Sequence, residues 1–284
     1  MEIPEARRRT TRYERRSPAL IAQRVKSLVP NALVPYVEDV YCWYKGIGDR
    51  RYTGRPGYAY LPPAALRYQV GSIGAEDFVN IGKACARDLE TALGRIGKTF
   101  QSFRDILDFG CGCGRTLSWL RDYSPACRFH GIDLNPKAIS WCRKHMGFAD
   151  FVVGNPLPPT SYSDNAFDLV YAISVFTHMD EPYQFAWLRE LKRITKPHAV
   201  LLISVNGESL MRQLPQEESA KVTITGFHAK PSRSLTKIFP EFYTNTYHTK
   251  EYIANKWSTD FKIHDHIPQG MNDHQDLVVL ERRG

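Results

Sequence analysis

Two acidic residues and a row of glycines in the middle of the chain have the types and spacing of a nucleoside-binding site. In the run DILDFGCGCGRTL, an apolar strand-like stretch contains Asp108 and leads into three glycines at alternate positions, Gly110, Gly112 and Gly114. Glycines let the backbone turn sharply and let a ligand approach exposed N–H groups closely. Asp133 stands 25 positions after Asp108, near the end of the next strand-like stretch, where open α/β folds bind ribose hydroxyls. The spacing therefore predicts a turn that binds a nucleoside.

Two other phosphate-binding patterns are excluded at this turn. A dinucleotide fingerprint, GxGxxG, needs a third glycine at position 115 or 117, and these positions hold Arg115 and Leu117. A Walker A loop is excluded because no Gly-Lys-Ser/Thr follows the glycines.

The elements that must position this turn alternate in type from residue 105 onward. Apolar runs predict strands at 105–110, 127–135, 150–155, 167–174 and 199–207, and helical patterns fall at 115–123, 136–146 and 181–196. This alternation predicts βαβ units and a parallel sheet covered on both faces. Two later strands, at 261–268 and 276–283, are separated by a short turn-rich loop, so the last strand is expected to run antiparallel.

The rest of the chain divides into three flanking segments. Residues 1–27 form a basic arm that we expect to be flexible, and residues 28–100 carry helical patterns that predict a cap near the substrate. The domain proper then covers residues 101–284, with an inserted lid at about 208–250.

The net charge of the protein is concentrated at one end. The formal charge is +8, but residues 1–26 contain eight basic and three acidic residues and so contribute +5 of it. The remaining chain is nearly neutral, which argues against extensive contact between the body of the protein and nucleic acid phosphates.

Six cysteines form no CxxC pair, and none combines with histidines at zinc-finger spacing. Cys111 and Cys113 lie between the turn glycines and are expected to be small fillers, so we predict no metal site. The longest apolar run, residues 199–205, is too short to cross a bilayer, and the amino terminus lacks the pattern of a secretory signal. We therefore expect no membrane span and a reduced, cytoplasmic protein.

These motifs together resemble the class I S-adenosylmethionine-dependent methyltransferases. DFGCGCGR is similar to the first motif of that family, GIDLN to its acidic motif, and FVVGNPLPPTSYSDNAFDLVYAISVFTHM to its third and fourth strands. The resemblance is strong over residues 101–206 and moderate over 250–284. It implies a Rossmann-like, seven-stranded, mostly parallel sheet with an antiparallel strand in a carboxyl-terminal hairpin, preceded here by the helical cap.

The resemblance also implies S-adenosyl-L-methionine as cofactor and S-adenosyl-L-homocysteine as product. By this likeness, Asp108 and the backbone of Gly110, Cys111, Gly112 and Gly114 hold the methionine end. Asp133 accepts hydrogen bonds from the ribose, Leu134 lies against the adenine and Asn155 faces its amino group. Ile173 and Ser174 lie beside the sulfonium.

Acceptor residues are less distinct in the sequence. His178 follows the fourth strand and could act as a general base, or it could be a structural histidine that caps the next helix. Tyr68 and Tyr247 are candidates to line the acceptor pocket, together with neighbouring aromatic residues such as Tyr243.

The sequence predicts a methyltransferase that acts on a small-molecule acceptor, with oxygen favoured over nitrogen or carbon. Two alternatives stay open. One is an RNA or protein methyltransferase that docks through the Arg-rich arm, and the other is a non-catalytic module that only binds the cofactor. The oligomeric state is not predicted.

Overall fold

The computed structural model describes residues 34–231 and 243–284, so the predicted basic arm lies outside the described residues. The chain divides into two compact units, Met1–Thr53 and Gly54–Gly284. In the first unit, the structure describes the helix α2 (Val34–Ile47) and the 3₁₀ turn η3 (Gly48–Tyr52). The second unit contains the sheet and every residue of the candidate site.

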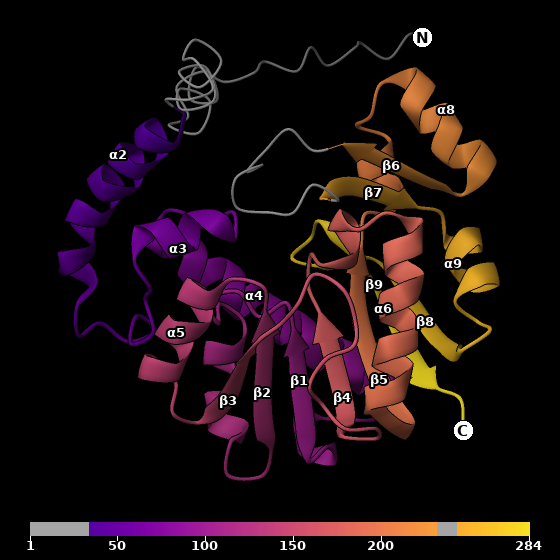
Figure 1. Ribbon diagram of the computed structural model, residues 1–284, viewed down its shortest axis with the longest axis horizontal. Helices are drawn as coiled ribbons and strands as arrows, with labels where there is room; N and C mark the ends of the chain where they lie inside the picture. Colours follow the sequence, from indigo (N-terminus) through magenta and orange to yellow (C-terminus); the bar gives the residue numbers. More distant parts are fainter. Residues whose placement is uncertain (1–33, 232–242) are drawn as a thin grey trace, which may run out of the picture. The chain divides into compact units, whose positions relative to one another are not determined.

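A single seven-stranded sheet forms the centre of the second unit (Figure 1). Its strands are β1 (Asp105–Phe109), β2 (Arg128–Asp133), β3 (Ala149–Val153), β4 (Phe167–Ala172), β5 (Thr195–Val205), β8 (Phe261–Met271) and β9 (Gln275–Arg282). They lie in the order β3-β2-β1-β4-β5-β9-β8, and β9 is antiparallel to both of its neighbours. The predicted fold class is confirmed, including the reversed last strand.

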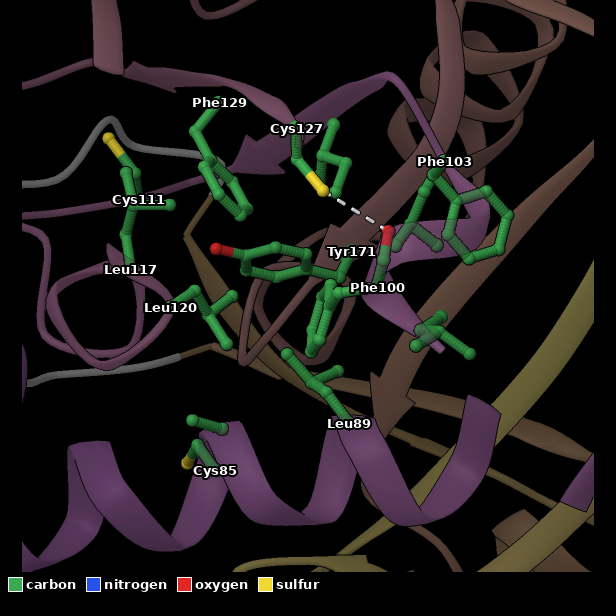
Figure 2. Packing of buried hydrophobic residues seen from close by; sticks show 14 of the residues in the cluster. Cys85, Leu89, Phe100, Phe103, Cys111, Leu117, Leu120, Cys127, Phe129 and Tyr171 are labelled. Atoms are coloured by element: carbon green, nitrogen blue, oxygen red, sulfur yellow. Dashed lines mark hydrogen bonds between the residues drawn. The ribbon is translucent and has the colours of Figure 1, made fainter. Parts of the chain in front are cut away.

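Helices cover both faces of this sheet. On one face, α4 (Ala75–Arg95) and α5 (Pro136–His145) pack their apolar sides into a core with β1, β2 and β4. Figure 2 shows Leu89 of α4 below Tyr171 of β4 and Phe100 of the turn η4 (Phe100–Ser102). On the other face, α6 (Glu181–Ile194) and α9 (Lys250–Lys256) pack against β4, β5 and β9.

The helix α4 shares its core with the sheet although the sequence assigned it to the cap. Leu89 and Leu93 of α4 are fully buried in the same cluster as Ile106 of β1. The predicted division into arm, cap and catalytic domain stays a prediction, but α4 is packed as part of the sheet unit. Ahead of it, the short helix α3 (Ala64–Gln69) leads to the site.

The segment after the glycine turn differs from the expected α-helix. Only two 3₁₀ turns form, η5 (Leu117–Trp119) and η6 (Arg121–Tyr123). A β carbon at Gly82 of α4 would lie 2.4 Å from the Arg115 carbonyl oxygen, so α4 crosses this segment at close range. Because that contact and the weak helix propensity of threonine, serine and tryptophan act together, the segment is held in tighter turns.

The predicted lid contains regular structure on both sides of its undescribed part. The helices α7 (Glu208–Met211) and α8 (Gln216–Thr225) precede a two-stranded ribbon of β6 (Phe227–Pro231) and β7 (Thr244–His248). Among the helices that the structure describes, we find none with the length and apolar character that crossing a bilayer requires.

Candidate functional site

The glycine turn follows β1 and is fixed by backbone hydrogen bonds to β2. The amide groups of Gly110 and Cys111 both donate to the carbonyl oxygen of Ile132, at 2.8 and 3.0 Å. Gly110 has φ +81°, and a β carbon there would lie 2.3 Å from Cγ2 of Val175. Both observations require glycine, because an L side chain would be strained and would clash.

Asp133 connects the end of β2 to this turn. One carboxylate oxygen accepts a hydrogen bond from the amide of Gly112 and the other from the amide of Asn135, each at 2.8 Å. Asn135 in turn caps α5 by accepting hydrogen bonds from the amides of Lys137 and Ala138. Burial raises the pKa of Asp133, and its two backbone hydrogen bonds partly oppose that shift. Each oxygen keeps a further lone pair with which to accept a hydroxyl group.

Asp108 is a buried carboxyl group beside the same turn. Its side chain is 4% exposed, and burial raises its pKa to about 8. The nearby Asp133 charge also raises this pKa, whereas the Tyr171 hydroxyl group and Arg115 lower it. A cationic group placed against Asp108 would favour its ionised form.

A cavity of about 390 Å³ opens at the carboxyl ends of β1, β2 and β4. That volume lies within the roughly 300–1,000 Å³ typical of small-molecule sites. Nine of the ten predicted cofactor residues line it: Asp108, Gly110, Cys111, Gly112, Asp133, Leu134, Asn155, Ile173 and Ser174. Gly114 is the exception, since a β carbon there would meet the Met146 and Cys142 side chains behind the turn. Its glycine is therefore explained by packing.

The end of β4 has a strained backbone where it borders the cavity. Ser174 has φ +58°, an uncommon conformation for a residue with a side chain. Its amide donates to Oγ of Ser204 and its hydroxyl group donates to Oε1 of Gln275. These two bonds hold the strained residue, as is common at functional sites.

His178 also lines the cavity, from the turn η7 (Phe176–His178) that follows β4. Its Nδ1 lies 3.0 Å from the carbonyl oxygen of Thr244, and its ring stacks on Tyr243 with centroids 4.2 Å apart. Burial lowers its pKa, while the Thr244 carbonyl and the Asn245 side chain raise it. His178 does not cap the next helix, because the side chain of Asp180 caps α6.

Because a carbonyl oxygen only accepts, the bond to Thr244 places a hydrogen on Nδ1 of His178. The other ring nitrogen, Nε2, then carries a lone pair in the neutral imidazole. His178 has the chemistry of a general base.

Two predicted acceptor residues do not line this cavity, Tyr68 and Tyr247. Side chains alternate along β7, so the buried Thr246 and His248 face the interior and Tyr247 lies on the other side of the strand. Tyr68 belongs to α3, and it is the next residue, Gln69, that borders the cavity. Tyr243 lies in the lining, and the role of Tyr68 and Tyr247 toward an acceptor stays a prediction.

Several lining residues were not predicted, and three of them are consecutive residues at the end of α3. Gln69, Val70 and Gly71 border the cavity, and Nη1 of Arg115 donates to the Val70 carbonyl at 2.8 Å and to Oγ of Ser72 at 2.9 Å. Nδ2 of Asn135 also donates to Oε1 of Gln69. Arg115, which stands where the dinucleotide fingerprint needs a glycine, was the one feature of the sequence that could have pointed to this segment, because its side chain joins the segment to the glycine turn.

The order of the strands and the glycine turn after β1 define a Rossmann-like fold. Comparison with known families agrees with a narrower class: residues 107–203 match a family described as a methyltransferase domain. Residues 107–203 thus contain a methyltransferase domain, the class that the sequence motifs resemble.

Curated proteins with similar sequences are methyltransferases. Ajmaline N-methyltransferase of Rauvolfia serpentina is 32% identical over 129 residues, which are 42% of this chain and 40% of that protein. The 2-methyl-6-phytyl-1,4-hydroquinone methyltransferase of Synechocystis is 28% identical over 196 residues, 66% of this chain and 54% of that protein. The matched parts thus span about half or less of these relatives.

Solved structures show a likeness at low sequence identity. A S-adenosylmethionine-dependent methyltransferase from Methanosarcina mazei has a TM-score of 0.47 at 19% identity, covering 63% of this chain and 92% of its own. The N-methyltransferase NodS from Bradyrhizobium japonicum, solved with S-adenosylhomocysteine, has a TM-score of 0.43 at 15% identity. Its match covers 70% of this chain and 87% of that one.

Proposed function

We propose that this protein transfers a methyl group from S-adenosylmethionine to a small-molecule acceptor, with a hydroxyl oxygen as the favoured acceptor atom. The observation that carries the proposal is one cavity that joins the glycine turn and Asp133 to a neutral histidine, His178. The two curated relatives described above are each named after a small organic molecule, which supports an acceptor of this kind.

The residues at the glycine turn suit the cofactor by shape and by charge. Gly110 and Gly112 border the cavity, and a β carbon at either would meet a neighbouring valine at less than 3 Å. In our proposal Asp133 accepts the ribose hydroxyls, Leu134 and Asn155 lie at the adenine, and Asp108 pairs with the ammonium group at the methionine end. Ile173 and Ser174 border the reacting centre.

The bound cofactor supplies an electrophilic methyl group on a sulfonium. The protein has to hold the acceptor oxygen in line with that methyl group and exclude water. Nε2 of His178 would accept the hydroxyl proton when the acceptor oxygen receives the methyl group, and the demethylated cofactor, S-adenosylhomocysteine, would be the leaving group. A low pKa keeps His178 neutral near pH 7, so the lone pair needed for this step is present.

The direct test is calorimetric titration with S-adenosylhomocysteine. Wild type is expected to bind, and Asp133→Ala is expected to bind about 100-fold more weakly, because two charge-assisted hydrogen bonds are lost. Asp122→Ala, which removes an exposed carboxylate in η6, is the matched control and should bind as wild type does. No binding by wild type, or equal binding by both aspartate variants, would overturn the cofactor assignment.

Methyl transfer itself is tested with a pool of metabolites and intact S-adenosylmethionine. We expect wild type, but not His178→Gln, to form a product that is heavier than its precursor by CH₂, because a methyl group replaces a hydrogen. If the cofactor binds but no acceptor in any pool gains mass, a non-catalytic binding module is favoured.

The charge of residues 1–26 supports one second candidate, an RNA or protein acceptor that docks through the Arg-rich arm. Deletion of residues 1–17 separates the two proposals. Activity that survives the deletion and varies little with salt supports a small-molecule acceptor, whereas loss of a salt-sensitive activity supports docking. The cytoplasmic location is likewise our proposal.

A further inference from the structure

Gln184 is a buried amide that joins three elements around His178. It lies in the first turns of α6, is 1% exposed and does not line the cavity. Its Nε2 donates to the carbonyl oxygens of Phe176 and Met179, at 2.8 and 2.9 Å. These two carbonyls stand on either side of His178 in the chain, so one amide group fixes both ends of the short turn that carries the histidine.

The other atom of the same amide fixes a second element. Oε1 of Gln184 lies 2.9 Å from Nε2 of His248, the last residue of β7. His248 is fully buried, and burial lowers its pKa to about 3, so its imidazole is neutral. Since an amide oxygen only accepts, Nε2 of His248 carries the hydrogen, and the orientation of the Gln184 amide follows from both sets of partners.

Further hydrogen bonds tie β7 to the turn. Oγ1 of Thr246 donates to the Phe176 carbonyl at 2.8 Å, and Nδ2 of Asn206 donates to the Thr246 carbonyl at 2.9 Å. The amide of His248 donates to the Asn206 carbonyl at 3.0 Å. The strand held in this way presents the Thr244 carbonyl to Nδ1 of His178.

We propose that Gln184 is a positioning residue that, through Thr246 and His248, holds His178 as the Nδ1–H tautomer with Nε2 free to accept a proton. The catalytic purpose of this arrangement rests on the proposed function, but the arrangement itself does not. The titratable groups that line the cavity with His178 are Asp108, Cys111, Arg115, Asp133 and Tyr243. The side-chain hydrogen bonds of Gln184 join it to Phe176, Met179, Thr246 and His248, so this network can be changed while the titratable lining groups are kept.

The test uses ¹⁵N-detected histidine side-chain spectra of the full chain, which distinguish Nδ1–H from Nε2–H. His178→Gln identifies the His178 signals among the nine histidines. Wild type is expected to contain the Nδ1–H tautomer alone, with a midpoint of titration below the ordinary value of about 6.5. In Gln184→Met the two tautomers are expected to mix and the midpoint to rise, because the loosened turn admits water to a group whose pKa is lowered by burial.

Two controls keep the result interpretable. Gln213→Met makes the same exchange at an exposed position and should leave the His178 spectrum unchanged. If Gln184→Met does not fold, Thr246→Val removes the hydroxyl donor from the same network, and Thr246→Ser should restore the wild-type spectrum. An Nε2–H tautomer in wild type, or an unchanged His178 spectrum in a folded Gln184→Met or Thr246→Val protein, would overturn the proposal.

Titration of the same samples with S-adenosylhomocysteine separates this inference from the proposed function. Gln184→Met should bind it as wild type does, since Gln184 lies outside the cavity lining. Failure of wild type to bind would refute the cofactor assignment and leave the tautomer result standing.

Discussion

The two ends of the cavity are built in different ways. At the glycine end, the backbone makes most of the structure: Gly110 and Cys111 donate to Ile132, and the amide of Gly154 donates to the Asp133 carbonyl at 2.9 Å. At the His178 end, hydrogen bonds of side chains hold the structure together. The bond from His178 to Thr244 joins residues 66 positions apart in the chain, and the bond from His248 to Gln184 joins residues 64 positions apart. A backbone frame varies little with side-chain identity, whereas a side-chain frame changes with each substitution.

This difference fits the two kinds of ligand that we propose. A cofactor that is the same for all members of a family suits an end fixed by main-chain hydrogen bonds. An acceptor that differs from one enzyme to the next suits an end formed by side chains from separate elements. Substitutions at the two ends should therefore have separable effects, and three predictions test that separation.

The largest effect is expected at Gly110. Gly110→Ala adds a β carbon 2.3 Å from Val175 at a residue with positive φ, so we expect a loss of roughly 3 kcal/mol in unfolding free energy. Gly97→Ala is the matched control, since Gly97 has φ +71° with nothing within 4 Å of the added carbon, and it should lose about 1 kcal/mol. Urea denaturation measures both.

A second variant tests whether the Val175 contact is the cause. Adding Val175→Ala to Gly110→Ala should recover the part of the loss that is due to the clash and leave the part that is due to φ. Equal losses of unfolding free energy at Gly110 and Gly97 would show that the glycine turn can adjust to an added β carbon. The proposed contrast between a rigid glycine end and the His178 end would then be wrong.

The local frame could be predicted from the sequence because its signals are local. The glycines, Asp108 and Asp133 stand within 26 positions, and each strand around them is a short apolar run with a helix beside it. Tyr68 and Tyr247 were chosen as aromatic residues in the segments that flank the sheet pattern. That choice does not show which residues of β7 face the interior, or that Gln69 rather than Tyr68 borders the cavity. Nothing in the sequence marked Gln184, because a glutamine near the start of an amphipathic helix is typical of a surface position. Its burial depends on contacts with Phe176, Met179 and His248, which only the folded structure shows.

A smaller effect is expected from the protonation of Asp108. Its pKa of about 8 means that the carboxyl group is mostly protonated at pH 7. A ligand ammonium group favours the ionised form, so binding lowers this pKa and releases a proton. Affinity for S-adenosylhomocysteine should therefore rise with pH up to about 8 and level off above it, by at most about tenfold per pH unit.

Calorimetry in buffers with different ionisation enthalpies counts the released protons. Asp108→Asn keeps the shape and an accepting oxygen but has no proton to lose, so its affinity should be lower at pH 8 and should lack the proton release that Asp108 causes. Proton release that is the same in wild type and in Asp108→Asn would assign it to the ligand and exclude Asp108 as the partner of the ammonium group.

The smallest effect on cofactor affinity is expected from a substitution of Tyr243, the aromatic residue at the His178 end. Tyr243→Ala removes the ring that stacks on His178 at 4.2 Å. Because burial is the main cause of the low pKa of His178, exposure of the imidazole to water should raise that pKa toward its ordinary value, as a histidine titration by NMR would detect. The affinity for S-adenosylhomocysteine should change by less than about twofold, since the glycine end is held by its own backbone bonds. A large loss of affinity for S-adenosylhomocysteine with no change in the titration of His178 would contradict this prediction. Tyr243 would then belong to the cofactor end of the cavity and not to the His178 end.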